Sequence, residues 1–253
     1  GCHFEGPVRT PMTHQGRQQQ VVVTRPAGQQ QRLMALLAEA GYQPVHQPAL
    51  EIEPVPVDGA MQRTLMELDR YHAVFFASVN AARLALSAMA DLWPQWPVGV
   101  HWLAVGRATA AELASWHLPA TVPEHGFNSE AVLALPCLQQ LHEKQVLICR
   151  GDSGRELLAQ SLEARGARVD ALAFYRRHGI SDITLSTQAD WVMVTSVQGW
   201  QALQSALPAG CGVVAAGARV AAAVQACHAG PVRVAASAHD EDMLAALMDG
   251  GGG

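Results

Sequence analysis

The sequence predicts an α/β protein with two parallel-sheet domains, and three observations lead to this prediction. Short apolar segments typical of strands alternate with amphipathic helical segments along most of the chain. The two halves of the chain repeat these segments in the same order, which indicates an internal duplication. The length of 253 residues and the hydrophobic share of 49% suit two domains of ordinary size.

The first repeated piece is a strand, a turn containing arginine and glycine, and an amphipathic helix. It covers residues 21–41 and recurs as residues 146–166, with Arg25 aligned to Arg150. Each helix is followed by a glycine, which readily adopts the left-handed backbone that ends a helix. The sequence therefore predicts one βα unit at the start of each half.

Three further pieces recur in the same order after this unit. They are 73–86 and 191–203, 103–113 and 214–224, and 128–130 and 240–242 with the helices that follow. In the first pair Ser78 aligns with Ser196, and in the second Gly106 aligns with Gly217. Strands that alternate with helices in this way form parallel sheets covered by helices.

Two segments stand outside the repeats. Residues 48–56 alternate apolar and acidic side chains between prolines, and residues 172–178 are aromatic and then basic. Both patterns indicate extended connectors. Pairing between them would join the two domains through a short two-stranded linker.

Composition excludes several classes of protein. The net charge of −5 leaves no basic field for nucleic acid. No apolar run reaches the roughly 18 to 20 residues of a membrane helix, and no signal sequence opens the chain.

The five cysteines include no CxxC pair, which favours reduced thiols in a cytoplasmic protein, and the eleven histidines show no metal-binding spacing. The P-loop and GxGxxG motifs are absent, and the GxSxG spacing of a serine hydrolase is not met.

Polar residues and glycines gather at the carboxyl ends of the predicted strands, the edge where open α/β sheets bind ligands. Helix N-termini at this edge suit phosphates or carboxylates. The candidate binding residues are Arg25, Ser78, Asn80, Gly106, Thr109, Arg150 and Ser196. Purely structural roles stay open for them: helix caps for the hydroxyl residues, ion pairs for the arginines and tight turns for the glycines.

With these pieces in place, the chain resembles the uroporphyrinogen-III synthase family over residues 21–247. The residues that carry the resemblance are Thr24-Arg25-Pro26, Phe76-Ala77-Ser78-Val79-Asn80-Ala81, Ala104-Val105-Gly106-Arg107-Ala108-Thr109-Ala110, Arg150-Gly151 with Gly154-Arg155, Phe174-Tyr175 and Thr195-Ser196. No one motif is specific by itself, and the resemblance depends on their order and duplication.

The resemblance implies two flavodoxin-like or Rossmann-like domains with exchanged first βα units and the substrate in the cleft between them. Domain 1 is expected to comprise residues 21–50 and 178–249, and domain 2 residues 55–172. Residues 1–20 and 250–253 are expected to be loose termini.

The resemblance also implies a cyclising hydro-lyase. It would remove water from the linear tetrapyrrole hydroxymethylbilane and close the macrocycle with the last pyrrole ring inverted. Tyr175 matches the family tyrosine proposed to assist departure of the hydroxyl, and packing is its alternative role. Val220 stands where many relatives carry threonine.

We expect no cofactor, no metal and no nucleic-acid or membrane partner, and a cytoplasmic monomer with hydroxymethylbilane synthase as the enzyme upstream. The alternative is a non-catalytic, two-lobed α/β protein that binds a tetrapyrrole or another anion, and the valine at position 220 favours it. A flavodoxin-like nucleotide enzyme would need a phosphate loop that the sequence lacks.

Overall fold

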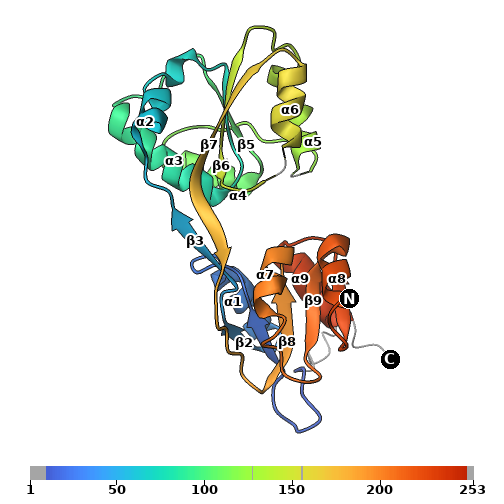
Figure 1. The fold of residues 1–253 in the computed structure, drawn as a ribbon. Coiled ribbons are helices and arrows are strands. Elements are labelled where there is room, and N and C mark those ends of the chain that lie inside the picture. Colours follow the sequence, from blue (N-terminus) through green and yellow to red (C-terminus); the bar gives the residue numbers. More distant parts are fainter. Residues whose placement is uncertain (1–9, 127, 155, 250–253) are drawn as a thin grey trace, which may run out of the picture. The chain divides into compact units, whose positions relative to one another are not determined.

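The computed structural model describes residues 10–126, 128–154 and 156–249. Two five-stranded sheets lie in two compact units (Figure 1). Unit 1 combines Gly1–Glu51 with His178–Gly253, and unit 2 is Ile52–Arg177. Cys2, Arg155 and the expected loose ends at 1–9 and 250–253 lie outside the described residues.

Unit 1 is built on a parallel sheet with strand order β10-β9-β8-β1-β2. Its strands are β1 (Gln20–Val23), β2 (Gln43–His46), β8 (Ala189–Val194), β9 (Gly212–Ala216) and β10 (Val232–Ala235). Its helices are α1 (Gln31–Glu39), α7 (Val197–Leu203), α8 (Gly217–Gln225) and α9 (Asp240–Met248).

Unit 2 has the strand order β3-β7-β6-β4-β5. Its sheet contains β3 (Leu50–Pro54), β4 (Ala73–Phe76), β5 (His101–Ala104), β6 (Gln145–Gly151) and β7 (Arg168–Gly179). Its helices are α2 (Gly59–Leu65), α3 (Val79–Leu92), α4 (Arg107–Ser115), α5 (Ser129–Leu133) and α6 (Leu157–Ala164), with 3-10 turns at Leu68–Arg70 and Pro136–Leu138.

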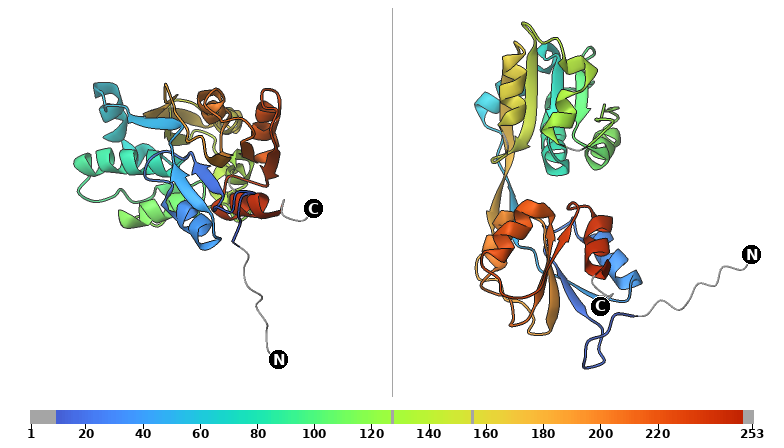
Figure 2. Two further views of the ribbon diagram at one scale, coloured as in Figure 1. Left: turned by 90° about the horizontal axis from the view of Figure 1, so that it is seen from below. Right: turned by 90° about the vertical axis from the view of Figure 1, so that its right-hand side faces the viewer.

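Helices cover both faces of each sheet because successive strand residues point to opposite faces (Figure 2). In β4, Phe76 packs with α2, α3 and α4, whereas Phe75 packs with α5 and α6. In β1, Val22 packs with α7 and α8, and Val23 packs with α1 and α9. Each unit therefore holds two apolar layers separated by its own sheet.

The exchange of the first βα units is confirmed by the strand order. β1 pairs with β2 and with β8 from the C-terminal part of the chain. β6, its counterpart in the repeat, pairs with β4 and β7 in the other sheet. The expected connectors are the neighbouring strands β3 and β7, which run antiparallel: Ile180 N donates to Ala49 O, and Val55 N donates to Phe174 O.

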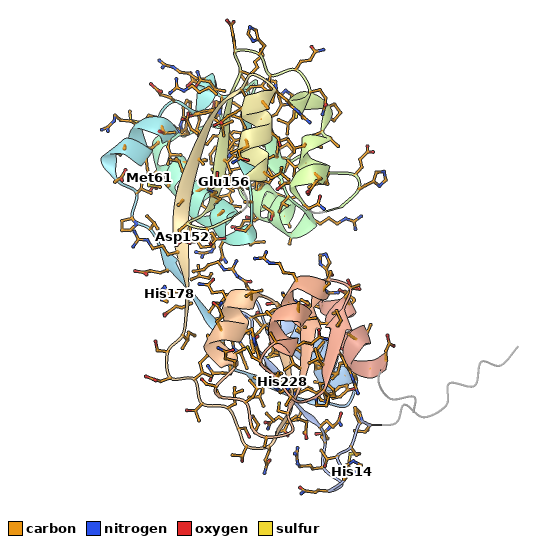
Figure 3. All side chains as sticks on the ribbon, turned by 45° about the vertical axis from the view of Figure 1, so that its right-hand side comes forward. His14, Met61, Asp152, Glu156, His178 and His228 are labelled. Atoms are coloured by element: carbon orange, nitrogen blue, oxygen red, sulfur yellow. The ribbon has the colours of Figure 1, made fainter. Side chains whose placement is uncertain are left out.

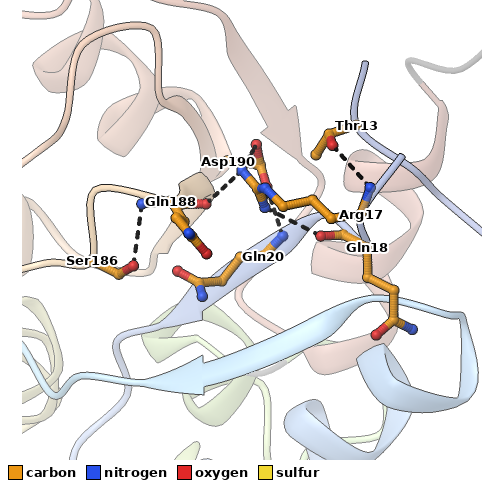
Figure 4. Close-up of polar contacts among 7 residues, drawn as sticks. All are labelled: Thr13, Arg17, Gln18, Gln20, Ser186, Gln188 and Asp190. Atoms are coloured by element: carbon orange, nitrogen blue, oxygen red, sulfur yellow. Dashed lines mark hydrogen bonds and ion pairs between the residues drawn. The ribbon is translucent and has the colours of Figure 1, made fainter. Parts of the chain in front are cut away.

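Residues 10–20, which the sequence predicts to be loose, are tied to unit 1, and Gln20 begins β1. Arg17 donates to both carboxylate oxygens of Asp190 at 2.9 and 3.2 Å, and the same carboxylate accepts from Gln20 N at 2.8 Å (Figure 4). Gly41 leaves room for this segment, since a Cβ there would lie 2.9 Å from the Pro11 ring. These contacts carry no periodic sequence signal, which explains the different expectation.

Among the described residues, none of the helices combines the length and the apolar character needed to cross a membrane.

Candidate functional site

A hydrogen-bonded pair of hydroxyl side chains lies at the carboxyl end of the unit 2 sheet. The hydroxyls of Tyr175 in β7 and Ser78 after β4 are 2.9 Å apart. Ser78 is also the N-cap of α3, and its Oγ accepts from Ala81 N at 3.1 Å. Because the cap fixes the serine oxygen and the tyrosine is only 6% exposed, both hydroxyls are held in one geometry.

These hydroxyl side chains line a cavity of about 390 Å³ that lies wholly within unit 2. The cavity is lined by Phe75, Ala77, Ser78, Val105, Asn128, Ser129, Ile148, Arg150, Gly151, Ser153, Gly154, Leu158, Ala159, Tyr175 and Arg177. Its lining combines apolar side chains with one amide, several hydroxyls and two guanidinium groups, and this polar set is termed the polar rim. The combination suits an organic anion, with the apolar side chains holding the carbon skeleton and the polar rim holding carboxylates.

Arg150 and Arg25 each pair with a carboxylate of their own unit. Arg150 Nη1 lies 3.0 Å from Glu156 Oε1 at the cavity, and the glutamate stands on the loop between β6 and α6 (Figure 3). Arg25 Nη2 lies 2.9 Å from Asp240 Oδ1 in unit 1 and also donates to Ala238 O. Glu156 is more exposed than Asp240, at 58% against 15% of the side chain, so solvent screens the Arg150 pair more strongly.

The other predicted residues lie outside this cavity. Asn80 accepts a long contact of 3.5 Å from Arg83 on α3, and Thr109 is 3% exposed near the start of α4. Gly106 is the N-cap of α4 and borders a separate cavity of about 310 Å³. Ser196 caps α7 in unit 1, where its Oγ accepts from Gly199 N at 2.9 Å.

The duplicated positions differ in their local structure. Gly217 has a φ of +84°, a conformation that favours glycine, whereas Gly106 is extended at −163°. Val220 is buried at 6% exposure in the core of unit 1, and its counterpart Thr109 is buried in unit 2. The valine keeps the shape of a threonine at this position and removes its hydroxyl.

Several residues that line the cavity are not among those expected from the sequence. Asn128 caps α5 by accepting from Ala131 N at 2.9 Å, and Ser129, Ser153 and Arg177 complete the polar rim. The sequence repeat does point to Asn128 and Ser129, because they stand at the start of the helix that aligns with α9. Arg177 gave no comparable signal, since its place in the rim depends on how β7 pairs with β6.

The described residues include no group of three or more histidine, cysteine or acidic side chains that could hold a metal ion. The described cysteines are Cys137, Cys149, Cys211 and Cys227, and all are free thiols. Burial raises the pKa of the Cys149 thiol well above its usual range. Burial, with a smaller contribution from Asp190, raises the pKa of Cys211 to about 12. Neither buried thiol is a thiolate at neutral pH, so neither is a candidate nucleophile.

Comparisons with known proteins agree on one family. Residues 31–245 match the family model described as uroporphyrinogen-III synthase HemD. The chain is 33% identical to the uroporphyrinogen-III synthase of Proteus mirabilis over 172 residues, which cover 68% of this chain and 86% of that protein. It is 31% identical to the Escherichia coli K12 enzyme over 196 residues, covering 74% and 80%.

Two solved structures share the fold. A mutant uroporphyrinogen III synthase of Thermus thermophilus matches with a TM-score of 0.60 and 21% identity, covering 91% of this chain and 99% of that one. The uroporphyrinogen-III synthetase of Helicobacter pylori 26695 matches with a TM-score of 0.58 and 16% identity at the same coverage.

Proposed function

The chain belongs to the uroporphyrinogen-III synthase family and is a hydro-lyase, and we propose that Tyr175 serves this reaction as the proton donor. The observation that carries the proposal is the 2.9 Å contact between the Tyr175 and Ser78 hydroxyls at the rim of a cavity that suits an organic anion. The substrate that the family implies is hydroxymethylbilane.

The first step is loss of the terminal hydroxyl group. Electrons of the adjacent pyrrole nitrogen expel the hydroxyl, its C–O bond breaks, and the oxygen leaves as water once it has received a proton. A phenol carries its proton at neutral pH, so Tyr175 can supply that proton. The cationic azafulvene that remains must then be held so that the substituted carbon of the last pyrrole attacks it, which is a task of positioning. That carbon carries no hydrogen, so its older bond to the neighbouring methylene bridge breaks. The free α-carbon of the inverted pyrrole then bonds to that methylene, loses its proton and closes the ring.

Ser78 gives the tyrosine a hydrogen-bond partner in both of its protonation states. Its Oγ accepts from Ala81 N at 3.1 Å, and its own hydrogen can point to the tyrosine oxygen. When Tyr175 releases its proton, this serine hydrogen bond favours the negative oxygen that results. The proton lost later from the closing ring restores the phenol, so the tyrosine is unchanged after one turnover.

The substrate carries acetate and propionate carboxylates, and the cavity rim offers groups that bind them. Arg150 is the first candidate, because the carboxylate it holds now belongs to the exposed Glu156 and a substrate carboxylate can replace it. Asn128 and Ser129 add polar side chains at the same rim. Five other residues stay proposed substrate contacts outside this cavity: Asn80, Gly106 and Thr109 in unit 2, and Arg25 and Ser196 in unit 1.

The experiment that tests the proposal is an isomer analysis of the porphyrinogen formed from freshly prepared hydroxymethylbilane. The expected product is type III, whereas spontaneous closure without ring inversion gives type I. Type I alone, at the rate of the buffer control, would reject the activity and leave a tetrapyrrole-binding protein.

We further propose that the protein is a cytoplasmic monomer that receives its substrate from hydroxymethylbilane synthase.

A further inference from the structure

Tyr175 lies directly over a glycine of the neighbouring strand. Gly151 ends β6 and pairs with Tyr175, and a Cβ at this glycine would lie 2.7 Å from both Cε2 and Cζ of the tyrosine ring and 3.1 Å from its oxygen. Real side chains do not approach this closely, and two ring atoms are met at once. The tyrosine ring thus occupies the space that any other residue at position 151 would fill.

A shift in strand register brings the tyrosine to this place. Arg150 pairs with Ala173 and the next residue of β6 pairs with Tyr175, so Phe174 is the extra residue of a β-bulge. Phe174 is buried with the α3 layer, while Tyr175 reaches the cavity on the α6 face. Beyond the bulge, Asp152 N donates to Tyr175 O at 2.9 Å and keeps the two strands together.

We propose that Gly151 is a positioning residue for the reaction, because its missing side chain lets the Tyr175 hydroxyl reach Ser78 and the cavity. This inference rests on the proposed role of Tyr175 and deepens it. A methyl group at position 151 would lift the ring off β6 and carry the hydroxyl away from the serine. The closest ring atoms are next to the oxygen, so displacement of the ring moves the reactive end of the side chain.

Unit 1 contains a matching arrangement that serves packing. A Cβ at Gly212 of β9 would lie 2.4 Å from the ring of Trp191 in β8, and Arg233 lies over the same ring at 4.1 Å. A glycine under an aromatic ring on the adjacent strand is a recognised device of sheet packing. Gly212→Ala is therefore a control for strain alone. Gly59 of α2 is a second control, since a Cβ there would meet only Arg63 Nη1 at 3.5 Å.

The test compares Gly151→Ala, Gly212→Ala and Gly59→Ala in single-turnover formation of type III product, measured well below every melting temperature. We expect Gly151→Ala to lower the rate at least about tenfold, close to the loss on removing a general acid. We expect the two controls to keep the parental rate, with a lower melting temperature for Gly212→Ala. In a Tyr175→Phe background, Gly151→Ala should change the rate less than about twofold. A full additional loss in that background, or a parental rate for Gly151→Ala, would overturn the proposal.

A denaturant titration tests, without an activity measurement, whether the Tyr175 ring lies on Gly151. Tyr175→Phe should lower the unfolding midpoint in the parental protein, because it removes the bond to Ser78, and should leave the midpoint nearly unchanged in the Gly151→Ala background. Equal shifts in both backgrounds would refute the contact between the Tyr175 ring and Gly151, even if the activity proposal holds.

If Gly151→Ala proves insoluble, the double variant Gly151→Ala/Tyr175→Ala should regain solubility, because the clash between the new methyl group and the ring is gone. Continued insolubility would count against the inference.

Discussion

Removal of a single oxygen atom separates the chemical role of Tyr175 from its packing role. Tyr175→Phe keeps the ring over Gly151 and deletes only the hydroxyl that contacts Ser78. Because general acid assistance contributes about 10²- to 10⁴-fold, we expect type III formation to slow at least about tenfold. Protein stability should fall only by the loss of one hydrogen bond, about 1 kcal/mol. Water in the open cavity can donate a proton in its place, so some activity should remain. A variant with the parental rate and type III to type I ratio would leave Tyr175 as a packing residue.

The thiols give a prediction at the same scale. Cys149 and Cys211 are buried and their pKa values are raised, whereas Cys227 is exposed. Alkylation requires an accessible thiolate, so iodoacetamide at pH 8 should modify Cys227 in the folded protein and spare the two buried thiols. Peptide mapping by mass spectrometry locates the label, and the urea-unfolded protein is the control in which all thiols react. Labelling of Cys149 as fast as Cys227 would contradict this burial.

Individual contacts were the least predictable level of the structure. The repeat pointed to Ser78 and Arg150, and both line the cavity because strand ends meet at one edge of a parallel sheet. The repeat does not predict that Tyr175 lies over Gly151, since this contact depends on the one-residue bulge at Phe174. Such a bulge has no periodic signal in the sequence, and the polar rim residue Arg177 was overlooked for the same reason.

A helix that begins directly after a strand has its N-cap at the sheet edge where ligands bind. Ser78 is such an N-cap, and it is also the hydrogen-bond partner of Tyr175. Ser78→Ala removes the cap of α3 and the partner of Tyr175, whereas Asp58→Ala removes only the cap of α2, where Asp58 accepts from Met61 N at 2.8 Å. Loss of the cap should cost about 1 kcal/mol of unfolding free energy in each variant. Ser78→Ala should lose the stability of its bond to Tyr175 in addition. Only Ser78→Ala should also slow type III formation, by about fivefold, the equivalent of one hydrogen bond of about 1 kcal/mol.

Denaturant unfolding and single-turnover kinetics on both cap variants measure these two effects separately. Equal kinetic losses in the two variants would mean that Ser78 acts through helix stability and has no part in the reaction. A kinetic loss for Ser78→Ala in excess of that for Tyr175→Phe would point instead to direct binding of substrate by the serine.

The order of elements was predictable because each repeat combines a strand period with a helix period and ends in a glycine. Gly41 and Gly166 both adopt the positive φ values expected after a helix, +90° and +94°. The limit of the repeat is visible at the aligned pair of Gly106 and Gly217, where only Gly217 has a positive φ. Sequence alignment equates two residues, whereas the backbone of each depends on the loop that follows.

At the scale of the whole molecule, the exchange of βα units sets the order in which the chain can fold. Unit 2 is continuous in sequence, from Ile52 to Arg177, whereas unit 1 needs residues from both ends of the chain. The sheet of unit 1 places β1 between β2 and β8, so its central pairing waits for the C-terminal part. Unit 2 should therefore complete its core first, and unit 1 should close last.

This organisation predicts that unit 2 folds alone. A fragment of residues 52–177 contains both apolar layers of its sheet, and its two ends belong to the neighbouring strands β3 and β7. We expect a cooperative thermal transition, monitored by near-ultraviolet circular dichroism. Unit 1 should fold as residues 10–51 joined to 178–249 by a short Gly-Ser linker, since Glu51 and His178 already meet at 3.3 Å. A fragment of unit 2 that melts without cooperativity would show that its core depends on unit 1, and the two units would then form a single folding domain despite their separate layers.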